Sequence, residues 1–379
     1  KIIEELKNES FQILAPTGKA SLRLKTATGD RSTKTIALLI HSAGNGKILE
    51  DFEDFSSSKD LNGPSIQNLI IDETSMVDLG QFAVLLKMLH DKKNSMKDIK
   101  RIILVGDENQ LPPIGYGRPF FDIIKLLKSD KKYIDENYVN LETNCRQKFD
   151  EEILKIIDLF RGRKTCYEEQ ISQISSGKFS SPGFNVQLWD NATELHQKIS
   201  TRLEYVVKKS VGKIPKDKPS QLNRLFCLNE DGSVQNDYTF EQTMNLDSWQ
   251  LITPYRGGYF GTLGLNDHIK SEYREHDPRE DQMWGKKIPF THADKIICIK
   301  NQYQHSKLQI SNGSMGLVNI RDQPQLHKKF YFPDKAENGG LKDLPGATEN
   351  DSPYELAYGI TIHKSQGSEF GHTFVVLPK

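Results

Sequence analysis

The sequence predicts an α/β protein built on a mainly parallel sheet. Short apolar runs that end at polar or turn-forming residues alternate along the chain with apolar residues at helical spacing. Unbroken apolar runs are typical of strands buried on both faces, and helical spacing indicates the helices that cover them. The predicted strands lie at residues 13–15, 69–71, 102–105 and 251–252, and helices at residues 82–89 and 153–160. Strands and helices that alternate in this way form a parallel sheet.

Further elements follow from the same spacing. Residues 1–7 place apolar side chains on one side of a helix, and residues 195–206 do the same. Polar and basic residues dominate residues 165–247, which indicates irregular insertions in a second domain. Residues 295–300 and 316–320 are β-like and are joined by Asn and Gly turns. They predict a small β-barrel module.

Length and composition limit the class of protein. A chain of 379 residues suggests two domains with a smaller third module. No apolar run approaches the roughly 20 residues that span a bilayer, so we expect no membrane partner. Lys plus Arg equals Asp plus Glu at 51 each, so any binding to nucleic acid must come from a local groove. The four cysteines show no CxxC spacing, which predicts unpaired thiols and a cytoplasmic protein.

Two adjacent carboxylates, Asp72 and Glu73, follow the predicted strand at residues 69–71. Phosphoryl transfer from a nucleotide needs one carboxylate to hold magnesium and its waters, and another to orient and deprotonate water. Asp72 and Glu73 suit those two roles. The alternative is an acidic helix N-terminus, which is common because the helix dipole favours it.

Two more segments carry polar residues after predicted strands. Residues 106–115 combine a Gly that allows a sharp turn, an amide at Gln110 that can report on a phosphate, and two prolines that stiffen the loop. In residues 357–370 a strand-like run breaks into small polar residues around Gly367. Such residues suit the phosphate oxygens of a nucleotide or a nucleic acid. His363 has no second metal ligand at suitable spacing.

In this order, these segments resemble the motifs of superfamily 1 helicases of the RecD type. That branch includes the exonuclease V alpha subunit and the Dda-like helicases. LAPTGKASLRL within residues 13–24 resembles motif Ia, DETSMVD motif II, GDENQLPP motif III, LETNCRQ at 141–147 motif IV, and HKSQGSEF motif V. Residues 253–266 and 290–318 also resemble this family, so the similarity runs from Phe11 to Pro378.

The resemblance implies an architecture and an activity. Two RecA-like parallel-sheet domains would span residues 1–145 and residues 146–285 with 346–379. A small β-barrel insertion would occupy residues 286–345. The activity implied is an ATP-dependent DNA helicase that moves 5′ to 3′ on single-stranded DNA, with ATP and Mg²⁺ as cofactors. Single-stranded DNA and a nuclease or recombination protein would be its partners, in DNA repair or recombination.

The resemblance also implies roles residue by residue. Asp72 would coordinate Mg²⁺ through water, Glu73 would be the catalytic base, Gln110 would sense the γ-phosphate, and Arg146 would be an arginine finger. The other implied nucleotide-binding residues are Asp107, Gln366, Gly367 and Glu369. The implied DNA contacts are Pro16, Thr17, Lys19, His363, Lys364 and Ser365. Alternatives remain open: Arg146 as an exposed ion pair, and Lys19 and Arg23 as solvated charges.

The sequence departs from the family at both ends. No GxxxxGK[ST] phosphate loop is present, and residues 43–48 imitate it without its leading Gly or a Ser or Thr after Lys47. The last arginine motif is also missing after Pro378. We therefore expect a fragment with impaired ATP hydrolysis, cut from an intact motor.

Two rival functions remain open. A non-catalytic DNA-binding or scaffolding subunit could use a helicase core, and an RNA helicase could carry the same motifs. Any nuclease would be a partner, since no nuclease arrangement of Asp, Glu and Lys stands out. Retention of Asp72, Glu73, Gln110 and Arg146 favours the enzyme, because a dead site has no need of four catalytic groups.

Overall fold

The computed structural model of the chain forms two compact units. The larger unit contains Lys1–Phe121 and Glu204–Lys379, and the smaller unit contains Asp122–Leu203. The structure describes residues 2–6, 9–30, 32–42, 66–90, 98–141, 168–181, 183–233, 245–274, 290–304, 307–319, 329–332, 341–342 and 352–378. The predicted helix at residues 153–160 lies outside them.

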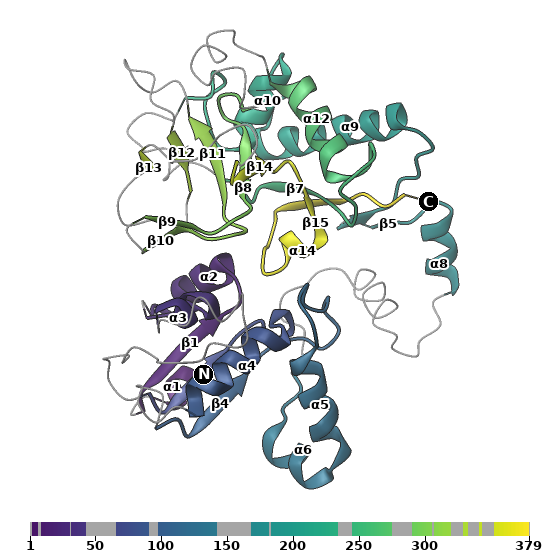
Figure 1. Cartoon of the computed structure of the whole chain (residues 1–379). Coiled ribbons are helices and arrows are strands. Elements are labelled where there is room, and N and C mark those ends of the chain that lie inside the picture. The colour runs from purple at the N-terminus through teal and green to yellow at the C-terminus, as the bar shows by residue number, and fades with distance from the viewer. Residues whose placement is uncertain are drawn as a thin grey trace. The chain divides into compact units, whose positions relative to one another are not determined.

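The N-terminal part of the larger unit is a parallel sheet with helices. Its strand order is β2-β1-β3-β4, and every neighbouring pair is parallel. The strands are β1 (Phe11–Ala15), β2 (Lys34–Thr35), β3 (Asn68–Ile71) and β4 (Arg101–Leu104). The helices are α1 (Ile2–Glu5), α2 (Gly18–Thr28), α3 (Ile36–Ser42), the 3-10 turn η2 (Thr74–Met76) and α4 (Leu79–His90) (Figure 1). The central strands β1 and β3 are almost fully buried, as their apolar runs predicted.

Strand β4 corrects one expectation. Its apolar run predicted burial on both faces, yet Arg101 and Ile102 are exposed and Ile103 and Leu104 are half-buried. The reason is its position, because β4 pairs with β3 and is the last strand of the described sheet. An apolar run therefore does not separate a central strand from an edge strand.

A second parallel sheet lies in the C-terminal part of the larger unit. Its order is β15-β7-β16, with strands β7 (Trp249–Thr253), β15 (Gly359–Thr361) and β16 (His372–Val375). Trp249 is fully buried in β7, and its ring stacks on Phe226 at 6.4 Å and on Tyr358 at 6.3 Å between centroids. The helices here are α10 (Lys218–Leu225), α12 (Thr262–Tyr273) and α14 (Ile362–Ser365). Figure 1 shows α10 and α12 side by side. The predicted α/β class with parallel sheets is confirmed.

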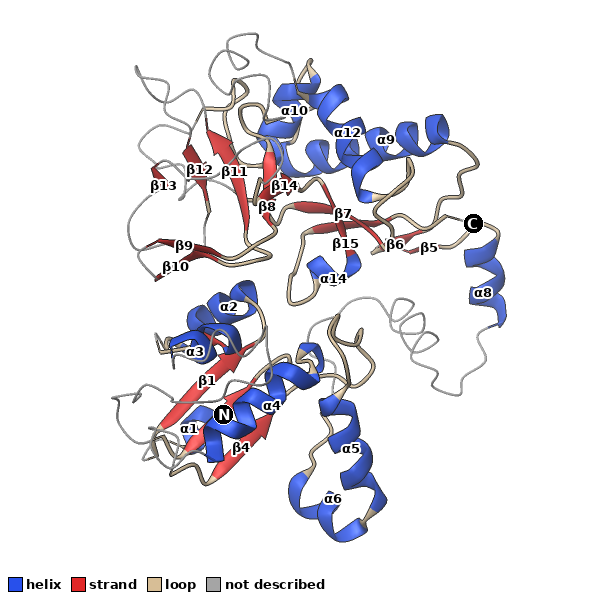
Figure 2. Cartoon of the chain, viewed as in Figure 1, coloured by secondary structure: helices blue, strands red, loops and turns tan. Residues whose placement is uncertain are grey.

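An antiparallel sheet occupies the region where we expected a β-barrel. Its order is β13-β12-β11-β8-β14 (Figure 2). The strands are β8 (Lys295–Cys298), β11 (Met315–Asn319), β12 (Lys329–Tyr331), β13 (Leu341–Lys342) and β14 (Tyr354–Leu356), and a separate hairpin joins β9 (Gln302–Gln304) to β10 (Lys307–Ile310). Among the described strands β13 and β14 end the sheet, so closure into a barrel is not confirmed.

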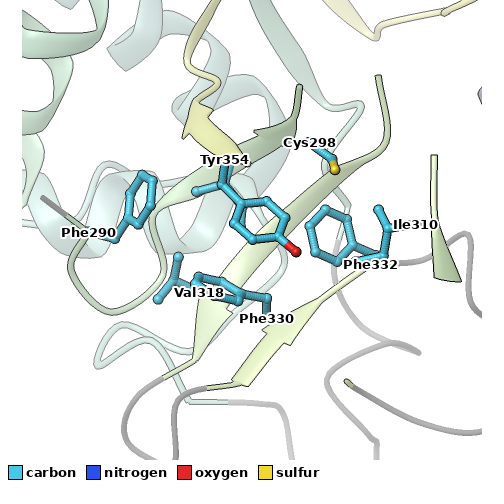
Figure 3. Close-up of a cluster of buried hydrophobic side chains, with 8 residues drawn as sticks. Phe290, Cys298, Ile310, Val318, Phe330, Phe332 and Tyr354 are labelled. Carbon is cyan, nitrogen blue, oxygen red and sulfur yellow. The ribbon is translucent and has the colours of Figure 1, made fainter. Parts of the chain in front are cut away.

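One face of this antiparallel sheet carries an aromatic core. Phe330 and Tyr354 lie 4.9 Å apart between ring centroids, and Phe290 meets Phe330 edge to face. The full cluster, drawn in Figure 3, is Phe290, Ile296, Cys298, Ile310, Val318, Phe330, Phe332 and Tyr354. Burial of large rings is the main stabilising contribution to so small a sheet.

The smaller unit is mainly helical, and two helices cross its boundaries. They are α5 (Pro119–Ser129) and α9 (Ala192–Val211). The other elements are α6 (Lys131–Asn137), α8 (Glu168–Ser175), β5 (Ser180–Ser181) and β6 (Phe184–Asn185). Helix α9 confirms the prediction for residues 195–206, since Leu195, Ile199, Leu203 and Val206 are all buried. No helix in the described ranges is both long and apolar enough to cross a membrane.

Candidate nucleotide and nucleic-acid site

The acidic pair lies at a strained turn directly after β3. Glu73 has φ 51° and ψ 37°, in the left-handed region that residues with a Cβ seldom occupy. Such a conformation costs on the order of 1–3 kcal/mol and is found mainly at functional sites. Asp72 is half-buried, and its Oδ1 accepts a hydrogen bond from the Glu73 backbone N–H at 2.9 Å. The two carboxylates are thus held by a turn whose conformation is unfavourable in isolation.

Thr74 fixes this turn from the other side. Its side chain is fully buried, and its hydroxyl donates to the Ile71 carbonyl at 2.8 Å. Its backbone N–H donates to the Val105 carbonyl at 2.9 Å, just beyond β4. The turn is therefore tied to its own strand and to the neighbouring strand, which offsets the strain at Glu73.

The loop after β4 meets the acidic turn. Ser75 Oγ donates to Gln110 Oε1 at 3.4 Å. Asp107 shapes the loop, because its Oδ1 accepts from the Asn109 N–H at 2.9 Å and its carbonyl accepts from the Gln110 N–H at 3.1 Å. The structure thus brings Gln110 to the turn that holds Asp72 and Glu73, at the carboxyl ends of two adjacent parallel strands. Ligands of open α/β sheets bind at this edge.

Gly106 allows this close approach of the two loops. A Cβ at this position would lie 3.0 Å from the Phe120 ring and 3.1 Å from the Ser75 backbone nitrogen. Both distances are tighter than ordinary contact, so a side chain here would push the loop after β4 away from the acidic turn. The sequence predicted that Gly106 allows a sharp turn, and the structure shows that Gly106 is needed for the close packing of the two loops.

The donor set fits a weakly held Mg²⁺ rather than a closed metal cage. No group of three or more His, Cys, Asp or Glu side chains gathers in a metal-binding arrangement within the described ranges. Mg²⁺ usually retains several waters and takes only one or two carboxylates together with substrate phosphates. Asp72 suits that role, because its Oδ1 accepts a hydrogen bond from the Glu73 N–H and from no other group of the described residues.

The predicted contacts in residues 16–24 lie at the start of α2. Thr17 is its N-cap, and its hydroxyl accepts from the Ala20 N–H at 3.2 Å. Lys19 forms an ion pair with Asp247 at 2.9 Å, and Arg23 forms one with Glu369. Neither cation is therefore a lone solvated charge. Pro16 ends the buried strand β1 and is half-buried.

The second predicted group lies where β15 passes into α14. Thr361 is the N-cap, and its hydroxyl accepts from the Lys364 N–H at 3.3 Å. Ser365 donates its hydroxyl to the Ile362 carbonyl at 2.8 Å, while His363 is exposed. The strand-to-helix turn predicted from the sequence is confirmed. Gly367, at φ 69°, follows Gln366 in a left-handed conformation.

Lys364 takes part in a cluster of charges that the sequence did not suggest. Glu355 Oε2 accepts from Lys364 Nζ at 3.2 Å, and its Oε1 accepts from Arg256 Nη2 at 2.5 Å. Arg256 belongs to the motif-like segment 253–266, but Glu355 is 99 positions away from it. No spacing rule could have paired them, because only the arrangement of β7, β14 and β15 brings them together.

Asn266 also has a role that only the structure shows. Its Nδ2 donates to the carbonyls of Leu356 and Gly359 at 3.0 Å each, and its Oδ1 accepts from the Gly359 N–H at 2.8 Å. One amide side chain of α12 thereby holds the connection between β14 and β15. The Asn at the end of the motif-like segment 253–266 therefore has a structural role in holding this connection.

Several predicted features lie outside the described residues. They are Arg146, nearly all of the LETNCRQ segment, the imitation phosphate loop at residues 43–48, and two of the four cysteines. The other two, Cys227 and Cys298, are present as thiols and not as disulfides. Burial raises the pKa of Cys298 to about 11, which makes it an unreactive core residue.

Comparison with known proteins extends these observations. Residues 1–176 match the family described as an AAA domain. The chain is 26% identical to the RecBCD enzyme subunit RecD of Haemophilus influenzae, with 97% of the chain aligned to 57% of that subunit. It is 24% identical to the ATP-dependent RecD2 DNA helicase of Deinococcus radiodurans, with 96% of the chain aligned to 38% of that protein.

Two further matches are to a protein without a described activity and to a solved structure. The chain is 27% identical over its full length to the uncharacterized protein MJ1519 of Methanocaldococcus jannaschii and covers 33% of it. A solved structure of two coordinating Pif1 helicases at forked DNA aligns with 99% of the chain and 83% of its own, at 15% identity and a TM-score of 0.39. The chain spans less than two thirds of the length of each curated relative named here. By its AAA-domain match and its end-to-end similarity to RecD and RecD2, the chain is similar to RecD-like helicases of superfamily 1.

Proposed function

We propose that this chain is the core of an ATP-driven helicase that moves 5′ to 3′ along single-stranded DNA. The observation that carries the proposal is that Gln110, bonded to Ser75, lies beside the turn of Asp72 and Glu73, with Glu73 in a strained conformation. Adjacent carboxylates beside a polar amide serve the hydrolysis of a nucleotide phosphate. The RecD and RecD2 relatives support this class of activity.

In this proposal each group near β3 and β4 has one task. Mg²⁺, held through Asp72, would supply positive charge to the phosphates of ATP. Glu73 would accept a proton from the attacking water, and Gln110 would contact the terminal phosphate. Arg146 would neutralise charge as the phosphate leaves, and Asp107, Gln366, Gly367 and Glu369 would complete the nucleotide site.

The proposed strand contacts are Pro16, Thr17, Lys19, His363, Lys364 and Ser365. They come from two parts of the larger unit, each built on its own parallel sheet. Two RecA-like domains at residues 1–145 and at residues 146–285 with 346–379, with a β-barrel insertion at 286–345, remain our proposed division. Partners in recombination or repair, and a cytoplasmic location, follow from the RecBCD relatives as proposals.

The test uses the full-length protein that contains this chain. We expect unwinding of duplex DNA with a single-stranded 5′ tail, little unwinding with a 3′ tail, and ATP hydrolysis stimulated by single-stranded DNA. Glu73→Gln should lower that hydrolysis by about 100-fold or more, the usual contribution of a general base, while strand binding persists. Strand binding without hydrolysis in the unaltered protein would favour a non-catalytic subunit, and stimulation by RNA alone would favour an RNA helicase.

A further inference from the structure

A cavity of about 300 Å³ lies beside the charge cluster of Arg256, Glu355 and Lys364. It opens among the loop after β7, helix α12 as far as Lys270, and the segment from β14 to α14. Apolar walls come from side chains that include Leu263, Phe290 and Ile297. At the small end of the range for ligand pockets, this volume suits part of a small ligand or one unit of a polymer.

Both cations of the cluster project from the carboxyl ends of paired parallel strands. Strand β15 pairs with β7, and Thr361 lies opposite Thr253 at the end of that pairing. Arg256 follows β7 and Lys364 follows β15 within a few residues. Open α/β sheets bind their ligands at this edge, so the two cations are placed where a ligand would arrive.

The carboxylate between them comes from a different sheet. Tyr354, the residue before Glu355 in β14, points into the aromatic core shown in Figure 3. Because side chains alternate along a strand, the Glu355 side chain leaves β14 on the opposite face from Tyr354, and both residues contribute to the cavity lining. It bonds Arg256 at 2.5 Å and Lys364 at 3.2 Å, with 28% of its own side chain exposed. Burial alone would raise the pKa of Glu355, but Arg256 and Lys364 reverse that effect and hold its pKa below the usual value.

The cavity wall presents two cations that an anion could reach, Arg256 and Lys364. Arg256, Lys364 and Lys270 face Glu355 and Asp267. Lys270 bonds the buried Asp294 at 2.8 Å, so it is already neutralised. Glu355 and Asp267 equal the two remaining cations in number, but of these two carboxylates only Glu355 forms ion pairs with Arg256 and Lys364. Arg256, whose side chain is 62% exposed, is available to a phosphate that approaches from solvent.

We propose that Arg256 and Lys364 bind one phosphate of a single nucleic-acid strand, with the adjoining nucleotide against the apolar wall, and that Glu355 competes with that phosphate. This inference rests on the proposed function and deepens it by naming a carboxylate that limits strand affinity. The phosphate takes the place of Glu355 on Arg256 and Lys364, so each capture of the strand breaks two ion pairs. A strand held in this way is released more readily, which suits a protein that must let go of DNA at every step.

The experiment measures the affinity of the full-length protein for a fluorescent oligothymidylate at several salt concentrations. Glu355→Gln should tighten binding about three- to tenfold, because partly exposed ion pairs oppose the phosphate only modestly. It should also steepen the plot of log affinity against log salt by about 0.7, the value for one more phosphate neutralised on a single strand. Arg256→Gln should weaken binding and flatten the plot by a similar amount.

Asp267→Asn is the matched control. Asp267 lines the same cavity, is exposed and forms no ion pair with Arg256 or Lys364, so this change removes the same charge without releasing the pair. We expect its affinity to stay within about twofold of the unaltered protein. In a protein that already carries Arg256→Gln, Glu355→Gln should tighten oligothymidylate binding less than Glu355→Gln does in the unaltered protein.

The outcomes separate this inference from the proposed function. Equal effects of Glu355→Gln and Asp267→Asn, or no effect of Glu355→Gln in a protein that binds and unwinds DNA, would overturn the inference alone. A change in the KM for ATP without a change in oligothymidylate binding would assign the pair to the nucleotide and also overturn it. Absence of oligothymidylate binding in the unaltered protein would overturn both.

Discussion

Ser75 and Gln110 are 35 positions apart in the chain, and a hydrogen bond of 3.4 Å joins their side chains. This bond is long, so it orients the amide more than it stabilises the fold. It links the turn that holds the two carboxylates to the loop that carries the proposed phosphate sensor. A change at one loop is therefore transmitted to the other.

Ser75→Ala should lower the rate of DNA-stimulated ATP hydrolysis in the full-length protein. The hydroxyl does not touch the reacting atoms in our proposal, so we expect a loss of about three- to tenfold in kcat, with KM nearly unchanged. Steady-state ATPase assays measure this, with Ser129→Ala on the exposed surface as the control. A fall confined to KM would contradict a role in orienting Gln110.

Two substitutions at Glu73 distinguish its proposed role in ATP hydrolysis from the strain of its backbone conformation. Glycine adopts φ 51° readily and alanine does not, so Glu73→Gly should be more stable than Glu73→Ala by about 1 kcal/mol. Both variants should lack ATPase activity in the full-length protein. Urea denaturation measures the difference. If Glu73→Ala proves the more stable variant, the left-handed conformation is not maintained in solution.

Asp294 is the centre of a buried polar cluster. Its carboxylate accepts from Tyr358 at 2.6 Å, Lys270 at 2.8 Å and the Thr291 N–H at 2.7 Å, and Arg274 lies at 3.6 Å. Asp294→Ala should lower the free energy of unfolding by about 3–5 kcal/mol, because it removes the carboxylate that balances the buried charge of Arg274.

Tyr358→Phe is the comparison for Asp294→Ala. It removes one neutral hydrogen-bonding group and keeps the charges balanced, so its loss should be about 1–2 kcal/mol. Chemical denaturation of both variants checks the pair. If both variants lose the same free energy of unfolding, the balance of buried charge at Asp294 does not contribute to stability.

Lys295 predicts a dependence of stability on pH. Burial lowers the pKa of Lys295 to about 7 in the folded protein, whereas an unfolded chain keeps a lysine pKa near about 10.4. Between these values the unfolded chain binds more protons, so the free energy of unfolding should rise with pH. The rise due to Lys295 is at most about 1.4 kcal/mol per pH unit, and it ends near pH 10.

Lys295→Met isolates this contribution, because the variant keeps the other titrating groups. The stability difference between unaltered protein and variant should grow in favour of the unaltered protein from pH 7 to pH 10. A difference independent of pH would show that the acceptors of Lys295 Nζ keep the ammonium charged. These are the carbonyls of Leu246 and Trp249 at 2.7 and 3.1 Å and the Gln250 amide oxygen at 2.8 Å.

The sequence was sufficient wherever a local pattern decides the structure. Apolar runs located β1, β3 and β7, and helical spacing located α9, because each is central or faces a core. The same rule misjudged β4, since exposure at a sheet edge depends on a neighbour that the strand's own residues do not encode. The positions of Asp72 and Glu73 could be predicted because they directly follow β3, and that of Gln110 because it lies in the loop after β4.

Other parts of the site depend on long-range topology. Glu355 meets Arg256 only because β14 of the antiparallel sheet runs on into β15 of the parallel sheet. Likewise, Lys295 looks like an ordinary charged residue at the start of a strand, yet it is fully buried. Local propensity places such residues at the surface, and only packing of distant strands reverses that expectation.

The connection held by Asn266 rigidly joins the antiparallel sheet to the parallel sheet of β7, β15 and β16. Only Ala357 and Tyr358 separate β14 from β15, and both are fully buried. The antiparallel sheet and the parallel sheet are therefore joined by a connection of two residues. Three hydrogen bonds from the amide of Asn266 hold this connection in place. No flexible residue lies between β14 and β15 that could absorb a displacement of the antiparallel sheet. A displacement of β14 should therefore be passed on to β15 and to α14, which carries the proposed strand contact Lys364.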